Sequence, residues 1–295
     1  MNSPVDKIKN KQSFIQHVQA KQESYTGVYR KLASYLINNF VEVAFMRAQQ
    51  WAAEVETSEV SVIRFVRVLG FKGYPDFSEK LQQIIRNQMT TTEYAELSVK
   101  KGRKGMDILM DIIKSEERNF NELVSKYSPK VMAEIVELLG RTERVAVVGL
   151  RSSSSLAEYS SYMFTRALAK EVITINQGGV ETFDSFLPWE GKEAVAVVFG
   201  YPRYPVRTLE IAEYLKRFNW PVVAVTNNEL SPLVPLADYV LYAPAHSVAF
   251  TDSMGAASVI INTIIMEYIN KYQDSSLERL KRFEELAREK QYYWT

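Results

Sequence analysis

Four polar side chains recur every third residue between positions 58 and 67, and together they could contact a polyanion. Ser58, Ser61, Arg64 and Arg67 share one face of a helix if the segment is helical, because residues three apart are neighbours on a helix surface. Short hydroxyl side chains can approach the base edges of DNA, and longer guanidinium groups can reach phosphates. Val60 points to the same side. This face is therefore predicted to contact nucleic acid.

The surrounding residues favour a helix-turn-helix, with helices at residues 48–54 and 58–69 and a turn at 55–57. Ser58 is a good N-cap for the second helix, and Glu59 suits the positive end of its dipole. The apolar contacts that such a pair of helices needs are Trp51, Ala52, Val55, Val62 and Phe65.

One residue of this turn departs from the expected pattern. The turn commonly holds glycine where this chain has Glu56, and a residue other than glycine is strained at positive φ. A bundle with two packed helices is the alternative interpretation. The charge balance of the segment and the FKGYPDF that follows favour DNA binding over that alternative.

A second group of candidate residues follows the sequence VAVVG, where four serines open a predicted helix at residues 152–155. Backbone N–H groups at the beginning of a helix, assisted by hydroxyls, can bind an anion. The alternative is that these serines only cap the helix and fill the loop. A dinucleotide site is not expected, because the fingerprint glycines are missing after Gly149 and the second strand ends in Asn176 rather than an acidic residue.

The elements that must position these residues differ between the two parts of the chain. Up to about residue 140 the apolar residues repeat with helical period, and Gly140 is expected to end a helix that Pro129 begins, at positive φ. After that, β-branched runs alternate with helix-length segments, at residues 144–149, 172–176, 194–200, 222–227 and 239–243. This pattern predicts a doubly wound α/β domain with a five-stranded parallel sheet, whose ligands bind beyond the carboxyl ends of the strands.

The predicted domains are a helix-turn-helix domain at residues 1–86, a hinge at 87–104, and an α/β domain with a C-terminal helix at 105–295. Residues 1–104 carry a net charge of +6 and the remainder −5, although the net charge of the chain is only +1. Chance scatter is one explanation of this asymmetry. The other is that only the first third meets a polyanion.

Composition gives weaker indications about location and cofactors. The chain has no cysteine, so it can form neither a disulfide nor a thiolate zinc site. We find no apolar leader and no stretch of 18 apolar residues, and we expect a cytoplasmic protein that does not enter membranes. No metal or cofactor is expected.

The sequence TSEVSVIRFVRVLGFKGYPDF at residues 57–77 resembles the N-terminal domain of the RpiR/MurR family of bacterial transcription regulators. The preceding LASYLINNFVEVAFMRAQQWAAE is similar to the first helices of that family. The resemblance implies an all-α DNA-binding domain. It also implies that the DNA-facing residues are Ser58, Ser61, Arg64, Arg67 and Lys72.

Residues 141–272 resemble the SIS (sugar isomerase) domain that follows in this family, with landmarks at the serine turn, GGVETF, VVAVTNNELSPLVPLADYVL and FTDS. In the family, the serine turn and a loop after the third core strand grip the phosphate of a sugar phosphate. This chain departs from the pattern, with Arg151 where the turn usually has glycine and with GYPRYPVRT at 200–208 where the loop usually reads Ser-x-Ser-Gly-x-Thr. The resemblance and these departures together imply an effector site formed by Arg151, Ser152, Ser153, Ser154, Glu181, Arg203, Tyr204 and Ser253.

The arginines of these loops predict an anionic ligand, because a guanidinium engages phosphate or carboxylate through two parallel hydrogen bonds. That ligand is a small sugar-related metabolite, not necessarily a phosphosugar. The alternative is that Arg151, Arg203 and Arg207 form salt bridges to Glu158 or Glu181 on neighbouring segments.

An aldose-ketose isomerase would need a general base and an acid on either side of a carbonyl. His246 reads as a lone surface imidazole, His17 lies far from the second domain in sequence, and Glu181 has no evident paired acid. We therefore assign no catalytic residue and predict a regulator that binds a double-stranded DNA operator and the effector. A sugar-phosphate isomerase with an accessory helical domain is the first alternative, and a SIS protein that acts only through protein partners is the second.

The predicted regulator is a homodimer or a dimer of dimers, because a short recognition helix contacts few base pairs and two-fold symmetry doubles the site. The apolar helix GAASVIINTIIMEYIN either covers the sheet or forms part of a subunit interface. The closing aromatics of the last helix either pack on a partner or fray.

Overall fold

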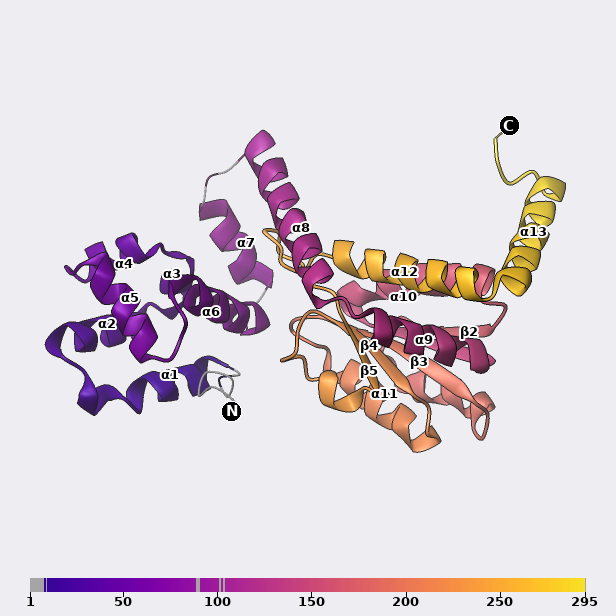
Figure 1. The fold of residues 1–295 in the computed structure, drawn as a ribbon, viewed down its shortest axis with the longest axis horizontal. Coiled ribbons are helices and arrows are strands. Elements are labelled where there is room, and N and C mark those ends of the chain that lie inside the picture. Colours follow the sequence, from indigo (N-terminus) through magenta and orange to yellow (C-terminus); the bar gives the residue numbers. More distant parts are fainter. Residues whose placement is uncertain (1–7, 9, 89–90, 101, 103, 295) are drawn as a thin grey trace. The chain divides into compact units, whose positions relative to one another are not determined.

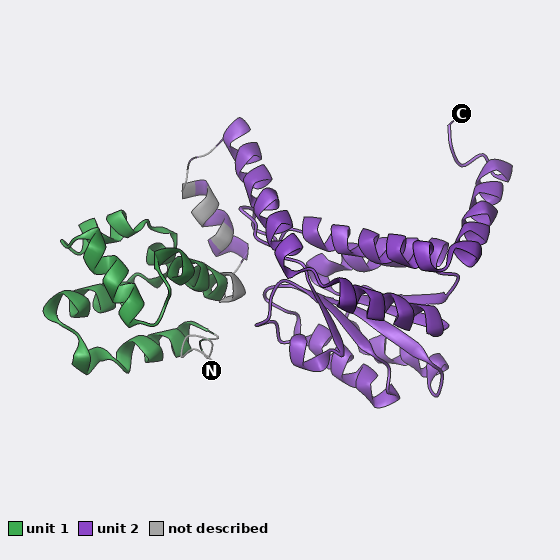
Figure 2. Ribbon diagram, viewed as in Figure 1, with its two compact units in different colours: residues 1–90 green, residues 91–295 purple. Residues whose placement is uncertain are grey.

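The computed structural model describes residues 8, 10–88, 91–100, 102 and 104–294. The chain forms two compact units, residues 1–90 and 91–295, and each is considered by itself (Figure 2). In the described part of the chain, no helix has both the length and the apolar character that a membrane crossing requires.

The first unit is helical throughout its described residues, as predicted. Its helices are α1 (Lys11–Gln19), α2 (Gly27–Asn38), α3 (Phe40–Phe45), α4 (Ala48–Glu54), α5 (Glu59–Val68) and α6 (Tyr74–Gln88) (Figure 1). A cluster of buried aromatic rings holds them together. The rings of Trp51 and Phe77 stack with centroids 5.5 Å apart, and Phe65 meets Trp51 edge to face at 6.0 Å. Such ring pairs stabilise a core beyond the area they bury.

The C-terminal end of α5 is fixed by two basic side chains from α1 and the turn after it. The Nε2 atom of His17 lies 2.6 Å from the carbonyl oxygen of Leu69, and Nζ of Lys21 donates to the carbonyl of Val68 at 2.6 Å. These carbonyls have no partner within the helix, and the two side chains supply the missing donors at its negative end. His17 therefore has a structural role in holding α5.

The second unit begins with α7 (Thr91–Lys100), α8 (Met106–Lys126) and α9 (Pro129–Arg141), and the predicted parallel sheet follows. Its strands are β1 (Arg144–Gly149), β2 (Glu171–Ile175), β3 (Ala194–Gly200), β4 (Val222–Thr226) and β5 (Tyr239–Tyr242), and their order is β2-β1-β3-β4-β5. Every pairing is parallel, and every residue of β3 is buried. The central strands are apolar on both faces because helices cover both.

The helices lie on the two faces of this sheet as a doubly wound fold requires. The α9, α10 (Ser154–Ala167) and α12 (Gly255–Lys271) helices cover one face, and α11 (Val206–Leu215) with the 3₁₀ segment η4 (Val180–Trp189) covers the other (Figure 1). The inner side of α12 is buried against the sheet, so the sheet-covering interpretation of this helix is confirmed. The last helix, α13 (Gln273–Glu289), is tied to α10 by a hydrogen bond of 2.6 Å from Nε of Arg279 to the carbonyl of Thr165.

One prediction about local structure is wrong. Gly140 does not end its helix, since α9 continues to Arg141, and Gly140 is absent from the glycines with positive φ. A side chain at this position would collide with the ring of Tyr272, so close packing is the reason for glycine. The predicted hinge at 87–104 contains α7, and its role as a hinge stays a prediction. Its residues 89, 90, 101 and 103 lie outside the described residues.

Candidate functional site

The α4–α5 pair has the helix boundaries that the sequence predicts, to within one residue. The turn closes with a hydrogen bond of 2.8 Å from the backbone N–H of Thr57 to the carbonyl of Ala52. Glu56 adopts φ = 53° in this turn, which is the left-handed conformation usually reserved for glycine. The five apolar residues predicted to join the two helices are all buried. The local fold is thus a helix-turn-helix with a strained residue in its turn.

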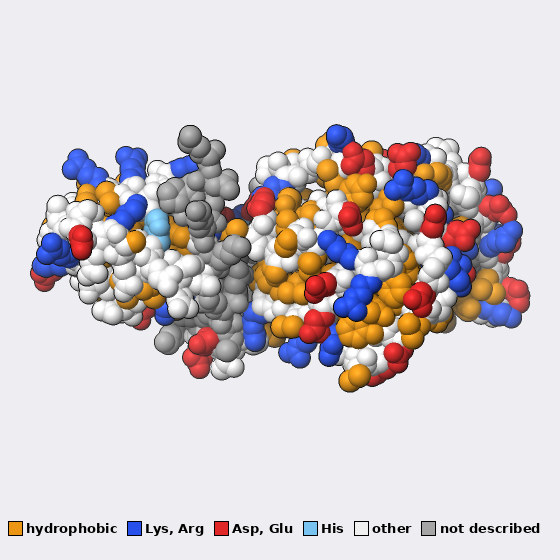
Figure 3. All heavy atoms as spheres, turned by 90° about the horizontal axis from the view of Figure 1, so that it is seen from below, with side chains coloured by type: hydrophobic (Ala, Val, Ile, Leu, Met, Phe, Trp, Pro, Cys, Tyr) orange, Lys and Arg blue, Asp and Glu red, His pale blue; other side chains and the backbone are white. Residues whose placement is uncertain are grey.

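The opposite face of α5 is left uncovered by the described residues of this unit. Ser58, Arg64 and Arg67 are exposed, Val60 is 55% exposed, and Ser61 is half-buried. Oγ of Ser58 accepts from the backbone N–H of Ser61 at 3.2 Å and lies 2.9 Å from its hydroxyl, which confirms Ser58 as the N-cap. Lysine and arginine side chains stand on the surface of this unit (Figure 3).

Lys72 follows α5 and is also exposed. Its backbone N–H donates to the carboxylate of Asp76 at 2.8 Å, which fixes the loop that carries it. The contact of these six residues with DNA remains a prediction, and the geometry meets its first requirement. None of the six side chains is buried in the unit that carries them.

In the second unit, the strand order reverses between β1 and β3, which is where an open α/β sheet has its ligand-binding crevice. From β1 the chain continues to β2 at one edge of the sheet, and from β3 it continues to β4 and β5 toward the other edge. The loops after β1 and β3 therefore lead in opposite directions. Open α/β sheets bind ligands at such a switch point, beyond the carboxyl ends of the strands. The helices α10 and α11 both begin beyond the carboxyl ends of these strands.

The serine turn after β1 is tight and carries Arg151. A side chain on Gly149 would collide with the backbone carbonyl of Ser153, so the chain can turn here only with glycine. Arg151 is exposed and has φ = 58°. Arg151 thus adopts a left-handed conformation, which favours glycine, at the position where the family pattern has glycine, and it adds a guanidinium.

The serines of this turn differ in their surroundings. Ser152 is exposed, Ser153 is buried and Ser154 is half-buried. Ser153 is the N-cap of α10, yet its side chain makes no capping hydrogen bond, and Ser155 bonds locally to the carbonyl of Ser152 at 3.1 Å. The side chain of Ser153 therefore does not cap the helix, contrary to the alternative interpretation of this serine.

The loop after β3 brings two further predicted residues to the crevice. Arg203 is exposed with φ = 65°, and the hydroxyl of Tyr204 donates to Oδ1 of Asn227 at 2.7 Å. Burial raises the pKa of Tyr204 to about 12, so its hydroxyl remains protonated at neutral pH. Asn227 directly follows β4 and so joins the same edge of the sheet.

The segment before Glu181 also reaches this edge. A Cβ added to Gly178 would lie 3.2 Å from Leu150 Cδ1 and 3.3 Å from Arg207 Cγ, while the carboxylate of Glu181 folds back onto Gly179. The alternative that Arg207 bridges to Glu158 or Glu181 is wrong. Arg207 pairs with Glu210 on its own helix at 2.8 Å, and its guanidinium lies 5.4 Å from the ring centroid of Phe183.

Ser253 is held by a different set of contacts. Its hydroxyl donates to Glu116 of α8 at 2.8 Å and accepts from the backbone N–H of Gly255 at 3.1 Å. The side chain is buried. To contact the effector as predicted, this hydroxyl would have to form a hydrogen bond to the ligand in addition to its bond to Glu116 of α8.

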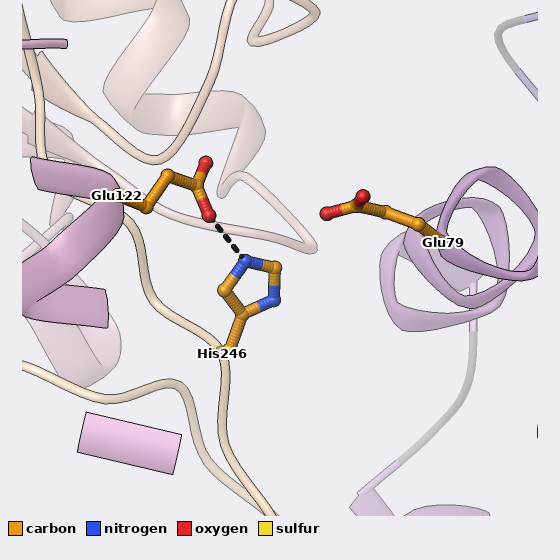
Figure 4. Close-up of side chains that lie close together, drawn as sticks. All are labelled: Glu79, Glu122 and His246. Atoms are coloured by element: carbon orange, nitrogen blue, oxygen red, sulfur yellow. Dashed lines mark hydrogen bonds and ion pairs between the residues drawn. The ribbon is translucent and has the colours of Figure 1, made fainter. Parts of the chain in front are cut away.

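The prediction that His246 is a lone surface imidazole is wrong. Its Nε2 atom lies 2.9 Å from the carboxylate of Glu122 on α8, as Figure 4 shows. This hydrogen bond, with the help of Lys126 at 3.0 Å, lowers the pKa of Glu122 to about 2 against the effect of burial. The imidazole thus fastens the loop after β5 to α8.

Three polar groups at the crevice were not predicted. The hydroxyls of Tyr201 and Thr208 are buried without a hydrogen-bond partner among the described residues, and Asn227 accepts from Tyr204. Thr208 could have been found, because it stands at the threonine that ends the family's loop pattern. Asn227 could have been found from its place after β4. Nothing in the sequence indicates that Tyr201 is buried.

A cavity of about 600 Å³ lies at the other end of the sheet, among the residues that precede the strands. It is lined by Leu138, Arg141, Thr142, Gly191, Lys192, Glu193, Ala194, Phe218, Asn219, Trp220 and Pro221. Because it opens at the amino ends of β1 and β3, it is separate from the crevice described above.

Both units match known protein families. Residues 12–88 match the helix-turn-helix domain of the rpiR family, and residues 138–267 match the SIS domain. An HTH-type transcriptional regulator from Thermotoga maritima is 22% identical over 86% of this chain and 89% of its own length.

Two solved structures share the fold. The sugar isomerase domain of an RpiR transcription factor from Sphaerobacter thermophilus has 20% identity and a TM-score of 0.57, covering 60% of this chain and 98% of its own. The Vibrio vulnificus NanR protein, solved in complex with ManNAc-6P, has 19% identity and a TM-score of 0.52, covering 93% of this chain and 97% of its own. With both domains present in this order, the chain belongs to the RpiR/MurR family of helix-turn-helix transcription regulators that carry a SIS domain.

Proposed function

We propose that this regulator binds an operator through α5. Binding of a small anionic sugar-related metabolite to the SIS unit then lowers or raises the affinity for the operator. The observation that carries the proposal is the uncovered face of α5, where hydroxyls precede guanidinium groups along the helix. Ser58, Val60 and Ser61 at the beginning of the helix are short enough to approach base edges, and Arg64, Arg67 and Lys72 can reach further bases or phosphates.

The effector is proposed to bind in the crevice between β1 and β3. The loops that border it carry Arg151 and Arg203 and lead into the N-termini of α10 and α11. This combination favours a phosphate or a carboxylate. The remaining predicted contacts, Ser152, Ser153, Ser154, Glu181, Tyr204 and Ser253, would orient the sugar. The related NanR protein was solved in complex with ManNAc-6P, and that complex supports this ligand class.

The path from the effector to DNA is proposed to run through α8. The loop after β5 is fastened to this helix by Asn119, Glu122 and Glu116, and α8 leads through α7 into the DNA-binding unit along the chain. The effector shifts the population only if it binds one arrangement of the chain better than the other. A ligand that moves the loop of Ser253 would act directly on Glu116 of α8.

The first experiment selects an operator from random DNA and measures its affinity at several salt concentrations. Log K should fall linearly with log salt, because the bound cations replace counterions of the phosphates. Candidate sugar phosphates, sugar acids and amino sugars are then added to the complex. A ligand of one class should change operator affinity by about fivefold or more, as is typical of allosteric coupling.

The isomerase alternative is tested with the same protein and ligands. Turnover of hexose or pentose phosphates, together with no affinity for any selected DNA, would contradict the proposed function. A protein that acts only through protein partners would give neither turnover nor DNA binding.

A further inference from the structure

Arg203, which the proposed function assigns to the effector, is hydrogen-bonded to α7. Its Nη1 atom donates to Oγ1 of Thr91 at 2.9 Å, and both side chains are exposed. Thr91 is the first residue of α7, and α6 ends at Gln88, so this bond lies just after the DNA-binding unit along the chain. A side chain from the loop after β3 thus holds the beginning of the segment that connects the two units.

The rest of α7 makes little contact with its own unit. Among its described side chains only Ala95 is partly covered, and Val99 is 78% exposed. Among the described residues, α7 packs extensively against no other helix or strand of that unit. A helix of ten residues is only marginally stable in water without tertiary packing. A single hydrogen bond at its first residue therefore matters for the order of this helix.

The loop that carries Arg203 is held more firmly than α7. Pro202 and Pro205 restrict the backbone on both sides of it. Between them and β4, the hydroxyl of Tyr204 donates to Asn227 at 2.7 Å and fixes the loop to the edge of the sheet. If the bond between the loop and α7 breaks, α7 is therefore the part that becomes free.

The hydroxyl of Thr91 is an acceptor that an anion can replace. It is neutral and accepts one bond from Arg203. A phosphate or a carboxylate brings the opposite charge and can accept two parallel bonds from one guanidinium. The guanidinium also stands at the N-terminal end of α7, where the helix dipole disfavours positive charge. Arg203 therefore gains free energy when it exchanges this hydroxyl for an anion.

We propose that Arg203 alternates between two partners, the hydroxyl of Thr91 and the anionic effector, so that binding of the effector releases the beginning of α7. This rests on the proposed function, because it takes the anion site between β1 and β3 as given. It adds a means by which that site acts on the connection to the DNA-binding unit. Because the two partners compete for one guanidinium, α7 in turn lowers the affinity of the site for the effector.

The first experiment measures anion binding to the full chain without DNA, at constant ionic strength, with inorganic phosphate and gluconate as the two probes. Thr91→Val removes the acceptor and keeps the shape of the side chain. It should raise the affinity for the anion that binds by about three- to tenfold, because Arg203 no longer has a competing partner. Thr92→Val is the matched control, since Thr92 is the neighbouring exposed threonine of the same helix, and its affinity should equal that of the wild type.

Hydrogen exchange of the backbone amides of residues 95–100 reports whether α7 is released. The bound anion should speed their exchange in the wild type at least about threefold, because a released short helix opens more often. Thr91→Val should exchange at this faster rate already without anion and should change no further with it. Arg203→Gln should also exchange fast under both conditions, and it should bind the anion at least about fivefold more weakly.

Three results would overturn the inference and leave the anion site of the proposed function standing. They are equal anion affinity in Thr91→Val and the wild type, weaker binding in Thr91→Val, and exchange of α7 that does not respond to a bound anion. Weaker binding would make Thr91 a contact of the ligand and not its competitor. If neither phosphate nor gluconate binds the wild type, the anion site itself is wrong, and the inference fails with it.

Discussion

The side-chain amide of Asn119 pairs with the backbone of His246 through two hydrogen bonds. Its Nδ2 donates to the carbonyl of His246 at 2.9 Å, and its Oδ1 accepts from the backbone N–H of the same residue at 2.8 Å. Ser115 adds a third bond to this carbonyl at 2.9 Å. A buried amide thus replaces the pairing that a neighbouring strand would give, and it ties α8 to the loop after β5.

Asn119→Ala should destabilise the SIS unit by about 2–3 kcal/mol, because it removes two hydrogen bonds and leaves the partly buried N–H of His246 without its acceptor. The control is Asn121→Ala, which changes an exposed residue of the same helix and should stay within about 0.5 kcal/mol of the wild type. Urea unfolding measures both. Equal stability of the two variants would mean that this bond pair does not fasten α8.

The pairing of Glu122 with His246 predicts a dependence of stability on pH. The hydrogen bond from His246 comes first among the causes that lower the pKa of Glu122 from 4.5 to about 2. A carboxyl group whose pKa is lowered by folding stabilises the fold above its unfolded value, and this contribution is lost as the pH falls from about 4.5 toward about 2.

Glu122→Gln should therefore be less stable than the wild type by about 1.5–3 kcal/mol at pH 7, the range for hydrogen bonds to charged groups. The difference should shrink toward zero near pH 2. Glu117→Gln, at an exposed position on the same helix, serves as the control and should follow the wild type throughout. A constant difference between pH 5 and pH 2 would contradict the assignment. Thermal unfolding at stepped pH gives the comparison.

The left-handed conformation of Glu56 predicts that glycine is the better residue in the helix-turn-helix turn. Glu56→Gly should stabilise the DNA-binding unit by about 1 kcal/mol, because a side chain at φ = 53° costs about 1–2 kcal/mol and glycine gives back part of the gain as entropy. Ala53→Gly, inside α4, should instead destabilise the unit by about 1 kcal/mol. A new glycine should therefore raise the stability at position 56 and lower it at position 53. Calorimetry of the two variants measures both changes. If the turn were unstrained, both variants would be less stable than the wild type.

Arg64 and Arg67 are predicted to act differently on DNA. Arg64→Ala should weaken operator binding by about 1–3 kcal/mol and relax the preference at one base pair. Arg67→Ala should weaken all sequences alike and reduce the salt slope by about 1 if it contacts phosphate. Lys130→Ala removes one exposed charge from the other unit and controls for net charge. Fluorescence anisotropy with selected and scrambled DNA separates these effects, and unchanged affinity in Arg64→Ala would remove this residue from the interface.

Much of the fold could be predicted because its signals are local and repetitive. The five β-branched runs sit between helix-length segments, so the predicted strands agree with the observed ones to within one or two residues. The helix-turn-helix could be placed because Ser58 is an N-cap and the residues packing under α5 recur at helical spacing. Such patterns depend on neighbouring residues along the chain.

The errors come from contacts between residues distant in sequence. Gly140 faces Tyr272, and His246 bonds to residues of α8 more than 120 positions away. No periodicity in the sequence carries this information. The sequence therefore predicts a surface loop after β5, whereas in the structure this loop is hydrogen-bonded to α8. The site residues on short turns are easier to find, since Arg151 and Arg203 depart from a known pattern. Their role in binding is still a prediction.

Arg151 allows binding and strain to be separated in one experiment, because its guanidinium and its backbone should respond to substitution in opposite directions. Arg151→Gly removes the donor proposed for the effector and should weaken effector binding by about 1.5–3 kcal/mol, the range for charged hydrogen bonds. It also relieves the left-handed φ of 58° and should stabilise the SIS unit by about 1 kcal/mol. Ala169→Gly is the matched control, since Ala169 is exposed with φ = 54° after α10 and should gain stability with unchanged effector affinity. If Arg151→Gly and Ala169→Gly respond alike to every ligand, Arg151 is strained for a reason other than binding, and the anion must be held by Arg203 and the helix N-termini.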